Sequence, residues 1–517
     1  MDVLQLILSI LPPIIAIGLA LITKEVISSL LIGILAGTLI YNQGNVIGMV
    51  TSMFELMGSK IGDNVNILIF LGLLGALVVI VTRAGGSAAY GEWASKKIKN
   101  RRGAALATSA LGCLIFIDDY FNCLSVGTVM RPVTDKYRIS RAKLAYLLDA
   151  TAAPICIIAP VSSWGASVAS YMADATGLNG MATFVQTIPY NFYAILTIIM
   201  IFVVCLTKLN YGPMAKHEKN ALEKGDLFTI KEDVVTDDFG ANRGKALRGK
   251  VYDLIIPILA LIICTILAMV STGGGFSGTP VLSSFGECDS SFSLVLGSFL
   301  ALVVTFILYI PRRVLDFHDF MSGITEGIKS MVPAFIILIL AWTIGGVCSS
   351  DYLNTGELVG NAIAASAFPT FLLPVIILIV AAFLGFSTGT SWGTMAILIP
   401  IGAAIASAPQ TRHLLLPIFG AILGGAVYGD HVSPISDTTI LSSTGAGCNH
   451  IAHVSSQMYY ATTVLLCCVV GEILMGLMGG NPLLPMLIAI ALLLVVLYVL
   501  HKVQSKKEAI DYSNVKH

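Results

Sequence analysis

Long apolar runs dominate the chain and predict an all-α polytopic membrane protein. A helix that crosses a bilayer needs about 20 apolar residues. Uninterrupted runs of about this length are Leu4–Ile22, Val26–Tyr41, Ile67–Thr82, Pro189–Leu206, Tyr252–Val270, Phe292–Ile310, Met331–Val347, Met458–Met478 and Leu483–Leu500. The first run follows Met1 and Asp2 without a basic region, so we expect a first span there and not a cleaved signal peptide.

Four further apolar stretches are interrupted by Gly, Pro, Ser, Thr or Asp. They are Ala104–Pro132, Ala142–Ser170, Phe371–Ile405 and Leu414–Leu441. Irregular backbone at membrane depth is tolerated only where protein or a water-filled cavity satisfies its polar groups. The interruptions therefore indicate where the working site lies.

Basic residues favour the cytoplasmic side of a membrane and orient these stretches. Lys and Arg crowd both flanks of Ala104–Pro132, which predicts a re-entrant hairpin from the cytoplasmic side with its tip near Asp118–Asn122. Few basic residues flank Phe371–Ile405, which predicts a second hairpin that enters from outside, with its tip near Ser387–Trp392. The remaining two broken stretches are expected to cross, which gives about eleven transmembrane helices.

This arrangement places all of the 30 Lys and Arg residues inside except Lys60 and Arg412. It also places the N-terminus outside and the C-terminus in the cytoplasm. The predicted units are a first inverted repeat over residues 1–207, a polar cytoplasmic linker over 208–250, a second inverted repeat over 251–480, and an extra span with a cytoplasmic tail over 481–517. The first hairpin occupies 104–132 and the second 371–405.

The two halves show the same order of spans, hairpin and broken span, in opposite orientation. Each hairpin ends near a proline, Pro132 or Pro400, and each broken span holds another, Pro160 or Pro434. Inverted repeats with discontinuous helices that meet at mid-membrane are the architecture of secondary transporters. The sequence thus predicts alternating access around a central site.

The composition excludes several classes of protein. Apolar types make up 56% of the chain and charged types 12%, against about 25% charged in soluble proteins, and the formal net charge is zero. A disordered protein, a nucleic-acid binder and an ordinary soluble enzyme are excluded. The ten cysteines lie mostly within apolar runs and are interpreted as packing residues.

Acidic residues inside a membrane are expensive and point to function. Asp118 and Asp119 are adjacent at the first hairpin tip, which favours ion or proton coordination over simple helix capping. The run Gly429–Thr439 offers the carboxylate, hydroxyl and carbonyl oxygens that hard cations prefer. The residues expected to bind a cation are Asp430, Asp437, Asp119, Asp118, Ser433 and Ser436.

The candidates for carrying a proton are His431 and Asp149. An imidazole titrates near neutral pH, although His431 could equally be a structural histidine bonded to Asp430. His450 and His453 lie three residues apart in a predicted inner loop, without Cys or Glu in a suitable position. We therefore expect no metal site there.

Hydroxyls and amides at the ends of half-helices suit a substrate carboxylate. The same residue types also serve as plain helix contacts, but two such runs in equivalent halves favour binding. The expected substrate-binding residues are Ser162, Ser163, Trp164, Ser167, Ser387, Thr388, Gly389, Thr390, Ser391, Trp392 and Asn122.

The run Gly429–Thr439 with the following Ser442–Gln457 resembles the signature of the NhaC-type sodium/proton antiporter family. The segments Ser387–Trp392 and Ser162–Ser167 are similar to other Ser/Thr/Gly-rich segments of that family. The resemblance implies paired re-entrant hairpins and ion-coupled transport. The wider group includes a malate–lactate antiporter and amino-acid transporters, so the resemblance implies a mechanism more than a substrate.

We therefore expect a sodium- or proton-coupled transporter of a small amino acid or carboxylate in a cytoplasmic membrane. A simple sodium/proton antiporter is the alternative, and an intramembrane aspartyl protease is a remote one, because the Gly-x-Gly-Asp pattern is missing before Asp430. The expected partners are the solute, sodium or protons, and lipid, without nucleic acid. No cofactor is expected beyond a transported or coupling sodium ion, and a homodimer is left open.

Overall fold

The computed structural model describes residues 3–23, 25–230, 249–279, 284, 288–349, 351–355, 358, 369–434 and 436–507. Its regular elements within these residues are all helical. Eight described helices are long and apolar enough to cross a membrane, or nine if Gly180–Tyr190 and Phe192–Leu206, bent by 53°, form one span. The predicted all-α polytopic membrane protein is confirmed; the predicted eleven crossings also counted shorter and broken helices.

The long apolar helices coincide with the uninterrupted runs of the sequence. They are α1 (Val3–Thr23), α2 (Val26–Tyr41), α3 (Val46–Ala84), α10 (Phe192–Leu206), α12 (Tyr252–Thr272), α14 (Ser290–Tyr309), α16 (Val332–Cys348), α22 (His450–Leu477) and α23 (Leu483–Lys507). Helix α3 has 39 residues and is about 58 Å long at 1.5 Å per residue. It therefore extends well beyond a hydrocarbon layer of about 30 Å.

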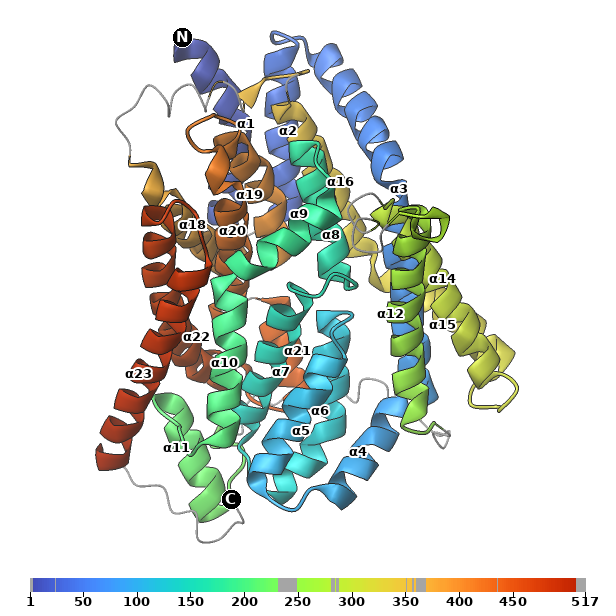
Figure 1. The fold of residues 1–517 in the computed structure, drawn as a ribbon, viewed down its shortest axis with the longest axis vertical. Coiled ribbons are helices and arrows are strands. Elements are labelled where there is room, and N and C mark those ends of the chain that lie inside the picture. The colour runs from blue at the N-terminus through green and yellow to red at the C-terminus, as the bar shows by residue number, and fades with distance from the viewer. Residues whose placement is uncertain are drawn as a thin grey trace.

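Each predicted hairpin is a pair of helices with a short break between them. Helix α5 (Arg101–Leu114) and helix α6 (Asp119–Lys136) are joined by residues 115–118. Helix α18 (Leu373–Thr388) and helix α19 (Ser391–Ala406) are joined by Gly389 and Thr390, and Gly389 has the left-handed φ of 68° that ends α18. The pairs lie in opposite halves of the molecule, α5 and α6 low and α18 and α19 high in Figure 1.

The two broken spans also form as the interrupting residues predict. Helix α7 (Arg141–Cys156) continues after a break as α8 (Ser163–Thr176), and α20 (Leu415–Val432) continues as α21 (Asp437–Ala446). Glycines let the hairpins and broken spans approach closely. A Cβ atom on Gly429 of α20 would lie 2.5 Å from the Ala382 carbonyl oxygen of α18.

The two halves interlock through the same kind of contact. A Cβ atom on Gly127 of α6 would lie 2.5 Å from the backbone of Gly445 in α21. Arg131 of α6 donates to the carbonyl oxygens of Thr444 and Gly445 at 3.1 and 2.6 Å, which satisfies the last turn of α21. The first hairpin is thus held against the broken span of the other half.

Several shorter helices were not predicted. They are α4 (Gly86–Lys97), α9 (Gly180–Thr187), α11 (Pro213–Lys219) and α15 (Phe317–Ser330), with the short turns η1 (Ile188–Tyr190), η2 (Asn220–Lys224), η3 (Gly275–Ser277), η4 (Thr370–Leu372) and η5 (Arg412–Leu414). Helices α12, α14 and α15 pack with α3 along one side of the molecule, on the right of Figure 1.

The described part of the predicted linker, 208–230, docks against the helices through a buried charge cluster. Glu218 of α11 is fully buried and pairs with Arg101, while its second oxygen accepts from the Ser140 amide at 2.9 Å. Lys143 lies 3.3 Å from the same carboxylate. Residues 231–248 lie outside the described part of the chain.

Candidate functional site

The N-termini of two half-helices from the two halves of the chain meet inside the protein. The Trp164 ring at the start of α8 and the Trp392 ring at the start of α19 have centroids 5.4 Å apart. Ser162 accepts from the Gly165 amide at 2.8 Å, and Thr390 accepts from the Gly393 amide at 3.4 Å, so each helix is capped in the same way. Helix N-termini carry partial positive charge and attract anions.

The acidic break of the first hairpin docks directly onto the α8 N-terminus. The Ser163 hydroxyl donates to Asp118 Oδ2 at 3.1 Å, and the Ser163 amide donates to the Ile117 carbonyl at 2.9 Å. Asp119 is 1% exposed, and a neutral donor, the Trp164 indole, interacts with its carboxylate. Burying a carboxylate without compensation is costly, so Asp119 is well suited to hold a cation or a proton.

Asp430, from the second half of the chain, lies near Asp119 of the first half. Ser391, at the start of α19, donates to Asp430 Oδ2 at 2.9 Å, and Ser436 donates to Oδ1. Asp430 is 2% exposed and interacts electrostatically with Asp119. We call Asp118, Asp119 and Asp430 the acidic cluster.

The remaining predicted cation ligands, Ser433 and Asp437, follow Asp430 at the break between α20 and α21. Ser433 donates to the Phe386 carbonyl at 2.8 Å and thereby ties the α20 break to α18. Its own carbonyl accepts from Thr439 at 2.9 Å. Asp437 begins α21, but its side chain lies outside the described part of the structure. Carboxylates, hydroxyls and carbonyls thus converge on the two breaks, and these are the oxygen ligands of hard cations.

Most of the predicted substrate hydroxyls are used by the protein itself. Ser162 donates to the Cys156 carbonyl at 2.7 Å, Ser167 to the Ser163 carbonyl at 2.8 Å, and Thr388 to the Leu384 carbonyl at 2.8 Å. Ser387 is half-buried in the last turn of α18. These contacts give the hydroxyls a role in shaping the helix ends.

Two further predicted substrate residues, Asn122 and Trp164, differ in how their side-chain donors are used within the protein. The Asn122 amide nitrogen donates to the carbonyls of Gly112, Ile115 and Thr151, which closes the first hairpin onto α7. The Trp164 indole N–H is buried and interacts with the Asp119 carboxylate. A ligand at the α8 N-terminus would share this donor with Asp119.

A second buried polar group, separate in its contacts from the acidic cluster, surrounds Asp149 of α7. His453 Nε2 lies 3.3 Å from Asp149 Oδ2, and His431 Nε2 lies 3.9 Å from Oδ1. Gln457 donates to Asp149 Oδ2 at 2.5 Å and to the His431 carbonyl at 2.8 Å. The Tyr193 hydroxyl of α10 is 3.0 Å from His431 Nδ1.

The sequence predicts only part of this group. His431 contacts Tyr193 and faces Asp149, and its ring has no hydrogen bond to Asp430. His453 was assigned to a loop, but it is fully buried in the first turn of α22. Asn449, an N-cap residue, precedes it, and His453 and Gln457 are four residues apart, which is the spacing of one helix face. Tyr193 gave no comparable signal.

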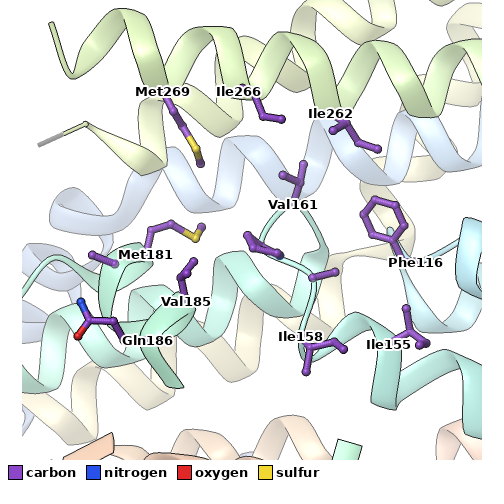
Figure 2. Close-up of a pocket in the computed structure, with 13 residues that line it drawn as sticks. Phe116, Ile155, Ile158, Val161, Met181, Val185, Gln186, Ile262, Ile266 and Met269 are labelled. Carbon is purple, nitrogen blue, oxygen red and sulfur yellow. The ribbon is translucent and has the colours of Figure 1, made fainter. Parts of the chain in front are cut away.

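An apolar cavity of about 840 Å³ lies beside the α7–α8 break, between α9 and α12. Figure 2 shows Ile262, Ile266 and Met269 on one wall and Met181 and Val185 on the other. Gln186 is the one amide side chain among the 13 residues that line it. Because a small charged solute needs several polar partners, this cavity does not suit it.

Comparison with known proteins agrees with this architecture. A solved structure, the YdaH transporter of Alcanivorax borkumensis, matches with a TM-score of 0.53 and 13% identity, over 84% of this chain and 90% of that one. An uncharacterized protein of Haemophilus influenzae is 41% identical over 486 residues, which cover 90% of each chain.

Two functionally named relatives match smaller parts of the chain. The malate-2H⁺/Na⁺-lactate antiporter of Bacillus subtilis is 30% identical over 214 residues, covering 34% of this chain and 42% of its own. The Na⁺/H⁺ antiporter NhaC of Alkalihalophilus pseudofirmus is 26% identical over 205 residues, covering 35% and 43%. Residues 155–477 match the Na⁺/H⁺ antiporter family as a whole, and that range holds both broken ends at which the halves meet. The chain therefore belongs to the Na⁺/H⁺ antiporter family, in its NhaC-type branch, and is a transporter and not an enzyme.

Proposed function

We propose that this chain is a secondary transporter, coupled to sodium or protons, that carries a small carboxylate or amino acid across the cytoplasmic membrane. The observation that supports the proposal best is the placing of the acidic cluster beside two opposed helix N-termini. Asp119 is buried, and the Trp164 indole beside it interacts with its carboxylate. One centre thus offers a place for a cation and a donor for an anion.

Charge explains why cation and cargo would bind together. Two like unit charges 4 Å apart repel by about 4 kcal/mol at an effective dielectric constant of 20. A cargo carboxylate next to Asp118, Asp119 and Asp430 is therefore unfavourable until a cation or proton neutralises part of the cluster. A bound cation lowers this repulsion, and the two helix N-termini add attraction for the carboxylate.

The choice of cargo is supported by one relative, whose name states that it exchanges malate and lactate. Both are small hydroxy acids, which fit a site with one aromatic N–H and two helix ends. Simple sodium/proton exchange is the alternative, and it is favoured by the finding that most hydroxyls near the breaks are already used within the protein. Sodium and protons alone would need only the carboxylates and carbonyls.

A thermal-shift screen of hydroxy acids and amino acids, with and without sodium, separates the two. The matched variants are Trp164→Phe and Trp342→Phe, since both indoles are buried and Trp164 lies beside Asp119. Loss of a hydrogen bond to a charged group costs about 1.5–3 kcal/mol, roughly 10- to 150-fold in affinity. We expect this loss for Trp164→Phe and none for Trp342→Phe. If no organic solute stabilises the protein while it exchanges sodium for protons in liposomes, simple antiport is correct.

A further inference from the structure

We propose that the apolar cavity beside the α7–α8 break binds one acyl chain of a membrane phospholipid, with the lipid headgroup at the Gln186 end. The cavity has a volume of about 840 Å³, and pockets that hold one small organic molecule measure about 300–1,000 Å³. The inference goes beyond the proposed function, because its ligand is neither the cargo nor the coupling ion. We call this cavity the acyl site.

The lining of the acyl site excludes water and ions. Gln186 is the one polar side chain among the 13 residues that line it, whereas a buried water needs typically about two to four polar partners. The Ser162 hydroxyl donates to the carbonyls of Cys156 and Ala159 at 2.7 and 2.8 Å. The Cys156 thiol donates to the Phe116 carbonyl at 3.1 Å. These carbonyls at the two breaks are therefore engaged within the protein, and the ligand that fits is apolar.

The acyl site is continuous with the surface that the protein presents to lipid. Helix α12 is apolar and long enough to span a membrane, and it packs with α14 and α3. Ile263 and Leu267 of α12 lie outside the cavity and are 53% and 50% exposed. Ile266 on one cavity wall and Val185 on the other are 41% and 44% exposed. Lipid tails are as apolar as these side chains, so acyl chains are the solvent at the mouth of the cavity.

The two ends of the acyl site differ in polarity, which orients the chain. Figure 2 shows Gln186 at the same end as Met269, and Phe116 at the opposite end beside Ile155. Helix α12 has 21 residues, and its length of about 31 Å matches a hydrocarbon layer of about 30 Å. Met269 lies in the last turn of this helix, near the edge of that layer. There the exposed Gln186 amide can donate to a lipid ester oxygen, while the chain runs inward to Phe116.

The acyl site also borders the joint between the first hairpin and α8. Phe116 belongs to the hairpin break and Val161 to the α7–α8 break, and both line the cavity. Next to them, the Ser163 amide donates to the Ile117 carbonyl at 2.9 Å, and the Ser163 hydroxyl donates to Asp118 at 3.1 Å. A chain in the cavity supplies dispersion contacts to both sides of this joint. The lipid therefore stabilises the position of Asp118.

Photo-labelling in proteoliposomes tests the acyl site on the wild type. The probe is phosphatidylglycerol with a diazirine near the end of one acyl chain, and labelled residues are identified by mass spectrometry. We expect label on Phe116 and on 155–161, which border the cavity, in addition to the lipid-facing Ile263 and Leu267. Label on α12 without label on Phe116 or on 155–161 would overturn the acyl site.

Ile266→Trp and Ile263→Trp are matched variants for the same assay. Both residues are exposed on α12, but only Ile266 lines the cavity. We expect Ile266→Trp to reduce labelling of 155–161 about tenfold, which corresponds to about 1.4 kcal/mol of steric penalty, and Ile263→Trp to leave it unchanged. Ala182→Phe fills the cavity from the opposite wall and should act like Ile266→Trp. Undiminished labelling in both cavity-filling variants would contradict the proposal.

Native mass spectrometry of purified protein gives the stoichiometry. After mild delipidation, the wild type and Ile263→Trp should each retain one phospholipid more than Ile266→Trp, and equal retention in all three would count against the acyl site. The competing occupant is a second copy of the chain. Cross-linking of two copies through Ile266→Cys, together with an unlabelled cavity, would assign the cavity to that contact and overturn the proposal.

Discussion

Removal of the Glu218 charge should release the described part of the predicted linker, residues 208–230, from the helices. Glu218 is fully buried and pairs with Arg101, and Lys143 is 3.3 Å away; the side chains of both basic residues are 5% exposed. The change Glu218→Gln keeps the shape but leaves these two buried cations without their counter-charge. Removing one partner of a buried ion pair typically costs about 3–5 kcal/mol.

The pKa of Glu218 gives a second measure of the free energy that this ion pair contributes. Although burial by itself would raise this pKa, Arg101, Lys143 and the Ser140 amide together lower it from 4.5 to about 2. A shift of about 2.5 pH units corresponds to about 3 kcal/mol. Because the folded pKa is depressed, this stabilisation is fully present above about pH 4.5 and is lost as the pH falls toward 2.

Hydrogen exchange of backbone amides in 213–224 measures this docking directly. About 3 kcal/mol corresponds to roughly two orders of magnitude faster exchange in Glu218→Gln at neutral pH, and the difference from wild type should shrink below about pH 4.5. Glu223→Gln is the control, since Glu223 is exposed in the same segment. Equal protection of 213–224 in wild type and Glu218→Gln would refute the reasoning.

Three further predictions concern the membrane topology, the helix packing and the acidic cluster. Cysteines at positions 97 and 136, which are exposed at the ends of α4 and α6, should react with an impermeant thiol reagent from the cytoplasm only; labelling from opposite sides would contradict the first hairpin. Gly429→Ala should lower the thermal stability by an amount equivalent to about 1–3 kcal/mol, because its Cβ atom would lie 2.5 Å from Ala382, whereas Gly58→Ala, which meets nothing within 4 Å, should not. Ser391→Ala removes a hydrogen bond to the Asp430 carboxylate and should weaken sodium binding about tenfold or more; unchanged sodium binding would argue against Asp430 as a ligand.

The positions of the hairpins could be predicted because local composition determines them. Apolar length, helix-breaking residues and the basic flanks of 104–132 are all properties of short segments, and the breaks at 115–118 and 389–390 lie where those residues indicated. The sequence names Asp119 and Asp430 separately as cation-binding candidates, because each acid lies near a break, but it does not predict that the two carboxylates lie close enough to interact. The amphipathic α15 was not predicted, because polar residues interrupt its apolar ones and it forms no continuous apolar run.

The buried polar group around Asp149 could be predicted only in part, because its members come together through packing. Asp149, Tyr193, His431 and His453 lie on α7, α10, α20 and α22, and no spacing along the chain links them. The sequence also could not show whether the predicted serine and threonine hydroxyls bind a solute or bond within the protein. A serine that caps a helix and a serine that binds a solute are the same residue type, and only the acceptor at 2.7 Å shows that Ser162 is engaged within the protein.

The central claim is that the acidic cluster binds the coupling cation, and sodium uptake into proteoliposomes under an imposed outward proton gradient tests it most directly. The wild type should accumulate radioactive sodium, and Asp119→Asn should reduce the apparent sodium affinity by well over tenfold, because Asp119 is a buried carboxylate whose interaction partners among the described residues include no basic side chain. Uptake with the same sodium dependence in Asp119→Asn and wild type would contradict the account.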